Sequence, residues 1–263
     1  MQTILDVKQL TMDFGGLRAI DHVDLDIKQG EIVALIGPNG AGKTTFFNCI
    51  TGIYKPTGGD VLIAPPEKKQ KRINGKKPNQ ITVAGLARTF QNIRLFANMT
   101  VLENVMIGQH CRTRTGIAGA VFQGKKVRAE ERRVIDYSHT LLKKVGLDQY
   151  VHHLAKNLPY ANQRRLEIAR ALATDPFLLL LDEPAAGMNP QETAELDQFI
   201  TRIRDEENVS ILLIEHDMRL VMSISDRIFV VDYGKKIAQG TPAEIQNNKN
   251  VIKAYLGEDI DDA

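Results

Sequence analysis

An apolar run that ends in a glycine-rich loop constrains the fold of this chain more than any other feature. Residues 32–36 are all apolar, and residues 37–44 read Gly-Pro-Asn-Gly-Ala-Gly-Lys-Thr. Such a run is typical of a strand covered on both faces in a parallel sheet. A loop of this spacing after a strand curls its backbone so that successive N–H groups point inward. The sequence therefore predicts an α/β fold in which a strand, a tight turn and a helix follow one another.

The residue types in this loop are those that hold phosphate. Inward N–H groups and the positive end of the following helix attract an anion. Lys43 can reach β- and γ-phosphates, and the Thr44 hydroxyl can bind Mg²⁺. The alternative is a tight glycine turn with a chance lysine, and the strand before the loop argues against it. The predicted nucleotide-binding residues are Gly37, Pro38, Asn39, Gly40, Ala41, Gly42, Lys43, Thr44 and Thr45.

A second apolar run ends in two acidic residues. Residues 178–181 are leucines, and Asp182 and Glu183 follow them. Neighbouring residues on a strand face opposite ways, so the two carboxylates cannot meet one metal ion in the same manner. Asp182 is placed to hold Mg²⁺ through water, and Glu183 to orient or deprotonate an attacking water. The alternative is a solvated strand end, which the glycine-rich loop upstream argues against.

Strand and helix patterns alternate along the rest of the chain. Residues 24–27 alternate polar and apolar as in a half-buried antiparallel strand. Apolar side chains with helical spacing follow Asn189, which can cap a helix that begins at Pro190. Together these patterns predict an α/β core with a largely parallel sheet and a ligand crevice at the carboxyl ends of its strands. Further apolar runs occupy residues 177–181, 211–214 and 228–231, and the helical positions are Leu196, Phe199, Ile200 and Ile203.

Composition limits the classes of partner. The net charge of +2 over 263 residues gives no field strong enough to predict a nucleic-acid partner. The two cysteines, Cys49 and Cys111, suit a reducing compartment better than a disulfide framework. Because the sequence has neither a leader pattern nor an apolar run near 18 residues, we expect a soluble chain whose membrane role requires a partner.

Two stretches interrupt the α/β pattern. Residues 64–80 are rich in lysine and arginine, which predicts a solvated loop; contact with anionic lipid or nucleic acid is the alternative. Residues 109–126 are expected to form an irregular insertion. An amphipathic helix follows it, with apolar positions Val134, Tyr137, Leu141 and Leu142.

From the glycine-rich loop to the acidic pair, the sequence resembles the ATP-binding cassette (ABC) family, over nearly the whole chain. This resemblance implies a P-loop NTPase (RecA-like) core with an N-terminal antiparallel β subdomain and a helical subdomain inserted at about residues 92–172. It implies one ATPase domain over residues 1–256, followed by an acidic tail at 257–263. It also implies ATP and Mg²⁺ as cofactors, and ATP hydrolysis coupled to transport.

The resemblance assigns roles to three further residues. Phe14 stands where the family places an aromatic ring against adenine; a core phenylalanine is the alternative. Gln91 falls at the family's Q-loop, where it would touch the metal and the attacking water; a plain loop amide is the alternative. His216 follows an apolar strand and matches the switch histidine beside the γ-phosphate, although a lone histidine is more often structural.

The signature motif departs from the family pattern. The motif usually reads Leu-Ser-Gly-Gly-Gln, whereas residues 158–163 read Leu-Pro-Tyr-Ala-Asn-Gln. Pro159 offers no donor to a phosphate, and Ala161 adds a methyl group where glycine permits close approach. Residues 186–189 also lack the aspartate that commonly ends the D-loop. Because ABC ATPases close head to tail, these departures predict pairing with a different ATPase and two unequal sites, with a homodimer as the alternative.

Three stretches resemble the branched-chain amino-acid importer ATPases in particular: residues 94–105, 182–190 and 251–257. The resemblance implies two membrane permease subunits, a second ATPase subunit and, indirectly, a solute-binding protein. It places the chain at the cytoplasmic face of the inner or plasma membrane as a peripheral subunit.

Other assignments remain open. The ending at residues 255–259 also resembles ATPases of lipopolysaccharide export. ABC proteins of translation or DNA repair carry paired cassettes or a coiled-coil insertion, which this chain lacks, and Glu183 argues against a slowly hydrolysing binding module. A capping box at Thr100 and Glu103 follows an apolar segment that either fills the local core or forms a groove for a membrane partner. The apolar residues of that segment are Ile93, Leu95, Phe96 and Met99.

Overall fold

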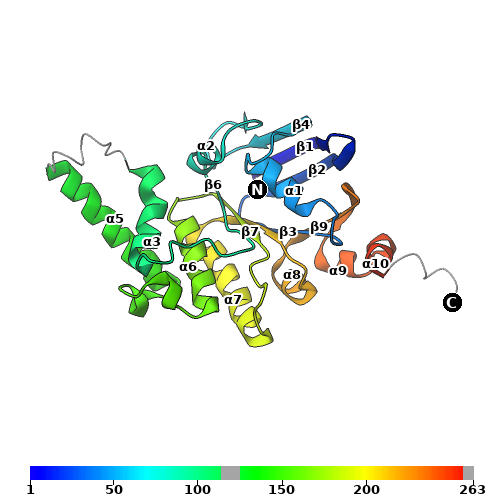
Figure 1. Ribbon diagram of the computed structural model, residues 1–263. Helices are drawn as coiled ribbons and strands as arrows, with labels where there is room; N and C mark the ends of the chain where they lie inside the picture. Colours follow the sequence, from blue (N-terminus) through cyan, green and yellow to red (C-terminus); the bar gives the residue numbers. More distant parts are fainter. Residues whose placement is uncertain (114–124, 257–263) are drawn as a thin grey trace. The chain divides into compact units, whose positions relative to one another are not determined.

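The computed structural model describes residues 1–113 and 125–256 (Figure 1). The chain forms two compact units, one built from residues 1–88 and the described residues from 177 onward, the other from residues 89–176. The predicted acidic tail lies outside the described residues, as does most of the predicted insertion at 109–126. The assignment of one ATPase domain with an inserted subdomain stays a prediction.

The first unit contains an antiparallel sheet with the strand order β2-β1-β4-β5. Its long central strand pairs with β2 on one side and with β4 on the other, both antiparallel. The antiparallel strand predicted at residues 24–27 is confirmed, because it forms the end of β2. The bounds are β1 (Thr3–Phe14), β2 (Leu17–Lys28), β4 (Gly58–Ile63) and β5 (Lys71–Arg72).

A six-stranded sheet in the same unit has the order β10-β9-β3-β8-β7-β6. Neighbouring strands are parallel except β10, which runs antiparallel to β9. The predicted parallel sheet is confirmed, and the carboxyl ends of β3, β7 and β8 meet at one edge. The bounds are β3 (Ile32–Ile36), β6 (Leu86–Arg88), β7 (Leu178–Asp182), β8 (Ser210–Ile214), β9 (Arg227–Asp232) and β10 (Lys235–Gly240).

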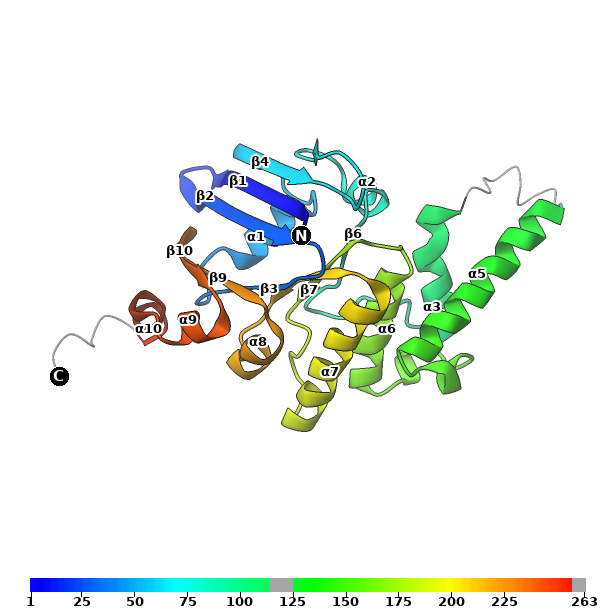
Figure 2. The same cartoon turned by 180° about the vertical axis from the view of Figure 1, so that it is seen from behind.

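Alternate side chains of β3 pack into two different hydrophobic cores, one on each face of the sheet. Leu35 belongs to a core that joins both sheets and includes Phe46 and Phe47 of α1 (Lys43–Ile50). Ile36 belongs to the core on the opposite face, which α8 (Met218–Ile224), α9 (Pro242–Gln246) and α10 (Lys249–Leu256) cover. Figures 1 and 2 show α8 and α9 on the side of β3 and β9 that faces away from β1 and β2. Burial on both faces explains why β3 is continuously apolar.

The other predicted elements of this unit have clear local causes. α7 (Pro190–Glu207) begins after Asn189, whose side chain accepts from two backbone N–H groups, so the predicted cap is confirmed; Glu192 bonds back and completes a capping box. In the basic stretch, every lysine and arginine is exposed, as a solvated segment requires. That stretch is less irregular than predicted, because β5 pairs with β4 within it and α2 (Pro78–Val83) begins at its end.

The second unit is helical. It contains α3 (Val101–Gly108), α5 (Lys125–Lys144) and α6 (Tyr160–Leu172), with a 3₁₀ helix at Gln109–Arg112. The predicted capping box starts α3, since Thr100 and Glu103 bond each other's backbone N–H groups. Leu141 and Leu142 of α5 are buried, as the amphipathic pattern predicts. Within residues 1–113 and 125–256, none of the helices has the length and apolar character needed to cross a membrane.

Candidate nucleotide site

Close packing forces glycine at two positions of the glycine-rich loop. A Cβ on Gly37 would lie 2.0 Å from the Val231 carbonyl oxygen, and one on Gly42 would lie 2.7 Å from the Ala19 oxygen. Gly42 also has a backbone φ of 101°, which residues other than glycine rarely adopt. The loop therefore lies so close to β9 and β2 that only glycine fits at these two positions. The N-terminus of α1 that follows has no side-chain cap, so its first N–H groups can serve an anion.

Lys43 lies across this loop. Its Nζ donates to the carbonyl oxygens of Gly37 at 2.7 Å and Pro38 at 2.9 Å. Burial lowers the pKa of Lys43, and the nearby Glu183 carboxylate opposes this. Phosphate oxygens would supply the negative charge that a half-buried ammonium needs.

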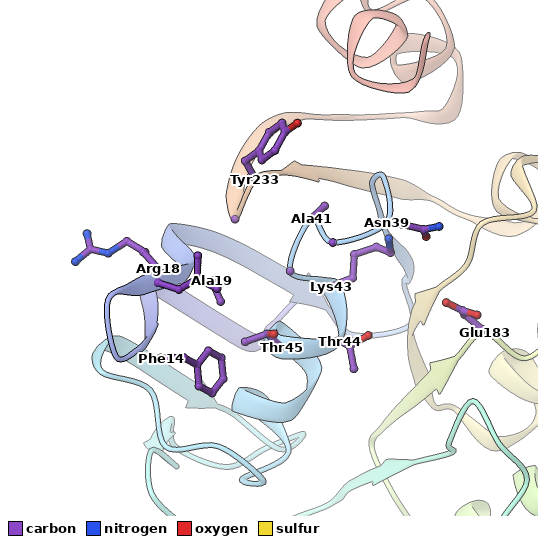
Figure 3. A pocket seen from close by; sticks show the side chains of 14 residues that line it. Phe14, Arg18, Ala19, Asn39, Ala41, Lys43, Thr44, Thr45, Glu183 and Tyr233 are labelled. Atoms are coloured by element: carbon purple, nitrogen blue, oxygen red, sulfur yellow. The ribbon is translucent and has the colours of Figure 1, made fainter. Parts of the chain in front are cut away.

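A cleft of about 580 Å³ brings most of the predicted residues together. Figure 3 shows Phe14 on one side of the loop and Glu183 on the other, with Lys43 and Thr44 between them. Phe14 is 41% exposed, so it is not a core phenylalanine, and its ring meets the Tyr54 ring edge-on at 5.2 Å. The predicted members of the lining are Phe14, Asn39, Gly40, Ala41, Gly42, Lys43, Thr44, Thr45 and Glu183. Gly37 and Pro38 are not in the lining, but their carbonyl oxygens accept from Lys43.

The two acidic residues at the end of β7, Asp182 and Glu183, diverge, as alternation on a strand predicts. Asp182 is buried, and its Oδ2 lies 2.6 Å from Arg88 Nη2. Glu183 lines the cleft and has a φ of 46°, which is rare for a residue other than glycine. Its N–H donates to the Ile214 carbonyl at 2.8 Å, which anchors the turn to β8. A strained conformation at a residue facing a cleft is typical of functional sites.

His216 lies beside this turn. Its Nδ1 is 3.7 Å from a Glu183 carboxylate oxygen, and its side chain is 65% exposed. Glu215, which the sequence analysis does not single out, is fully buried beneath both loops. One of its oxygens accepts from Ala185 N at 2.8 Å, and the other accepts from His216 N at 2.9 Å. Glu215 therefore ties the loop after β7 to the loop after β8.

Gln91 belongs to the second unit, where its side chain is exposed. Its place at the metal stays a prediction.

The residues present fit a magnesium ion. Thr44 offers a hydroxyl in the cleft (Figure 3). Asp182 is the last residue of β7 at the same sheet edge, where one of its carboxylate oxygens is bonded to Arg88. Among the described residues, no group of three or more His, Cys, Asp and Glu could enclose a metal. Mg²⁺ needs no such cage, because it is usually held by one or two carboxylates together with substrate phosphates.

Comparison with known proteins decides the family. Residues 20–186 match the family described as ABC transporter, and that match covers more than half of the chain. The chain belongs to this family. A separate match at residues 235–261 is to the C-terminal segment described as branched-chain amino acid ATP-binding cassette transporter. The predicted resemblance and the predicted P-loop NTPase fold are thus confirmed.

Similar proteins align with this ABC ATPase over almost its full length. LivG of Escherichia coli, a high-affinity branched-chain amino acid transport ATP-binding protein, is 50% identical over 98% of this chain and 99% of its own. BraF of Pseudomonas aeruginosa, described in the same words, is 49% identical over 97% and 98%. The crystal structure of the cassette MJ1267 in its ADP conformation matches with a TM-score of 0.83 and 30% identity, over 98% of this chain and 100% of that one.

Several residues at the site of the ABC ATPase could not be predicted from the sequence. Arg88 ends β6 and pairs with Asp182, a signal that is visible only once β6 is known to neighbour β7. Tyr255 of α10 reaches the glycine-rich loop; burial raises the pKa of Tyr255, and a hydrogen bond with the Gly37 backbone opposes the rise. Neither contact has a local sequence signal. Further lining residues are Leu17, Arg18, Ala19, Tyr233 and Gly234.

Proposed function

We propose that this ABC ATPase hydrolyses ATP to drive import of branched-chain amino acids through separate membrane subunits. The observation that carries the proposal is the match of residues 235–261 to the branched-chain amino acid segment. Identity of about one-half to LivG and BraF over whole chains supports the same solute class. The alternative, lipopolysaccharide export, rested on the similar ending at residues 255–259, which lies within that match.

The site geometry suits hydrolysis of a triphosphate. Backbone N–H groups of the glycine-rich loop and the Lys43 ammonium bind the phosphates, and the Phe14 ring stacks on adenine. Glu183 orients the attacking water and takes its proton, with His216 beside it at the γ-phosphate. Thr44, Asp182 and Gln91 would hold Mg²⁺, which supplies charge neutralisation at the phosphates when bound.

Two ATPase subunits are needed for a complete site. In the head-to-tail arrangement of the family, residues 158–163 face the partner's nucleotide. Here α6 begins after Pro159 without a side-chain cap, and the Tyr160 side chain is 43% exposed. A tyrosine and a proline cannot cradle a phosphate as serine and glycine do. We therefore propose pairing with a second, different ATPase and unequal turnover at the two sites.

An exposed apolar segment supports contact with a membrane subunit at the cytoplasmic face. Phe96 is 47% exposed, and Ile93, Leu95 and Met99 are only partly buried, so they do not fill the core. A similar cassette, CbiO1 of Clostridium perfringens, is part of the transporter complex cbiONQ, at 26% identity and a TM-score of 0.78. We propose that this segment receives a helix of the permease.

Replacing Phe96 by lysine tests the permease contact. A positive charge also avoids an ion pair with Arg170, whose guanidinium lies 5.6 Å from the Phe96 ring. Desolvating an unpaired charge should weaken the assembled complex and lower solute transport about tenfold or more. Binding of MgATP, measured on the purified chain, should not change. Phe96→Leu is the apolar control, and normal transport by the Phe96→Lys variant would contradict the contact.

Purification of the intact complex tests the function as a whole. A tag on this chain should bring down two permease chains and a second, non-identical ATPase from detergent-solubilised membranes. In proteoliposomes, a leucine-binding protein loaded with leucine should stimulate ATP hydrolysis. Recovery of this chain as the sole ATPase would refute the unequal pair. Stimulation by lipopolysaccharide instead of leucine would refute the solute class.

A further inference from the structure

The second unit contains a buried ion pair on α6 that the proposed chemistry does not use. Arg164 and Glu167 have side chains that are 0% and 1% exposed, and Arg164 Nη1 lies 2.8 Å from Glu167 Oε2. Buried ion pairs are weak contributors to stability, because the cost of desolvating two charges offsets their attraction. In other proteins, replacing a buried ion pair by apolar residues of similar volume is often neutral or stabilising. The pair therefore needs an explanation other than stability.

Both members reach the same stretch of backbone. Arg164 donates to the carbonyl oxygens of Phe90 at 2.7 Å and Gln91 at 2.8 Å. Glu167 accepts from the Arg94 N–H at 3.1 Å with its other oxygen. A guanidinium has a rigid fork of donors, so two adjacent carbonyls held by one arginine have a fixed orientation. Arg164 and Glu167 thus fix the backbone of residues 90–94 through three hydrogen bonds.

A third buried side chain fixes the far end of the segment. The Asn104 carboxamide accepts from the Phe96 N–H at 3.0 Å and donates to the Phe96 carbonyl at 3.1 Å. The side chains of residues 91, 92, 94 and 96 are nevertheless exposed. The segment is therefore a loop with exposed side chains on a backbone that buried polar groups hold at both ends. Such an arrangement pre-organises whatever its side chains contact.

We infer that Arg164 and Glu167 are positioning residues that fix the backbone of Gln91 for its work at the nucleotide. This rests on the proposed role of Gln91. Both residues lie near the start of α6, directly after residues 158–163. A displacement of the backbone at residues 90–94 therefore also displaces the start of α6, which carries the signature motif. The polar pair supplies this link, and an apolar pair could not, since it offers no partner to a carbonyl or an N–H group.

The double variant R164M/E167L tests the inference without leaving an unpaired buried charge. Hydrogen exchange on the purified full chain, read at single residues, should show the Arg94 amide exchanging at least about tenfold faster than in wild type. The Phe96 amide, which Asn104 holds, should keep its protection and serves as the internal control. Lys143→Met, which removes an exposed positive charge from α5, is the matched control and should change neither amide.

Kinetics of the purified complex separate positioning from a merely structural role. R164M/E167L should lower kcat for ATP about 10- to 100-fold, as expected when a reacting group is misplaced, while KM changes less than about twofold. Adding Gln91→Ala to R164M/E167L should then cause no further loss, because the pair acts through that residue.

Three results would overturn the inference: an unchanged Arg94 amide, a wild-type kcat in the folded double variant, or losses that multiply when Gln91→Ala is added. If R164M/E167L fails to fold, Arg164→Lys replaces it: a single ammonium cannot hold two adjacent carbonyls as the guanidinium fork does, so kcat should fall, and a wild-type kcat would contradict the inference. A wild-type complex without ATPase activity would refute the proposed function instead. The exchange of the Arg94 amide would still decide whether the pair holds the backbone.

Discussion

Glu183→Gln should lower the rate of ATP hydrolysis by the assembled complex about 10²- to 10⁴-fold, the usual loss when a general base is removed. Glutamine keeps the shape of the side chain but cannot take a proton from the attacking water. Glu183 lines the cleft, and one of its carboxylate oxygens lies 3.7 Å from His216 Nδ1. Among the described residues that line the cleft, no other is acidic, so none can replace Glu183 as the base. Affinity for MgATP should change less than about threefold, because the phosphate contacts come from the glycine-rich loop and Lys43.

Phosphate release by the complex and binding of a fluorescent ATP analogue measure the two quantities separately. Glu206→Gln is the control, since it removes an exposed carboxylate near the end of α7. A Glu183→Gln variant that hydrolyses ATP at the wild-type rate would show that the residue does not act on water. The chain would then be a nucleotide-binding module whose hydrolysis depends on some other group.

Gly37→Ala should damage both stability and nucleotide binding. The new Cβ would lie 2.0 Å from the Val231 carbonyl oxygen, so β9 and the loop must move apart. Backbone strain of about 1–3 kcal/mol should lower Tm by roughly 2–12 °C. Displaced N–H groups lose one or two charge-assisted hydrogen bonds to phosphate, each worth about 1.5–3 kcal/mol. MgATP affinity should therefore fall at least about tenfold.

Calorimetry and titration of the full chain with MgATP measure these effects. Gly16→Ala is the control, because a Cβ there meets nothing within 4 Å and its backbone needs no left-handed conformation. Wild-type affinity in Gly37→Ala would mean that the loop does not cradle the phosphates.

Local patterns predicted the part of the fold that carries the phosphate site. The apolar run of β3, the glycine spacing after it and the leucines of β7 each have a cause within a few residues of sequence. Burial on both faces made β3 uniformly apolar, and the backbone approach to Val231 made Gly37 necessary. The capping boxes before α3 and α7 were equally local, since each is completed three residues downstream.

Buried polar partners could not be predicted in the same way. Arg88 and Asp182 are 94 residues apart, and they meet because β6 lies beside β7. Glu215 reads in sequence as an ordinary residue at a strand end, yet it is 1% exposed and bonds backbone groups of two loops. The pair on α6 is hidden for the same reason, because its partners lie 73 and 74 residues away. Charged residues are predicted to be solvated by default, and only the fold shows which ones are not.

A structure of the Glu183→Gln variant with MgATP would test the central claim most directly. We expect the β- and γ-phosphates against the backbone N–H groups of residues 40–45. Asp182 and Thr44 should lie on the metal side, and the side chain at position 183 should point at the γ-phosphate. Phosphates bound away from this loop, or a side chain at position 183 turned away from the γ-phosphate, would contradict the account.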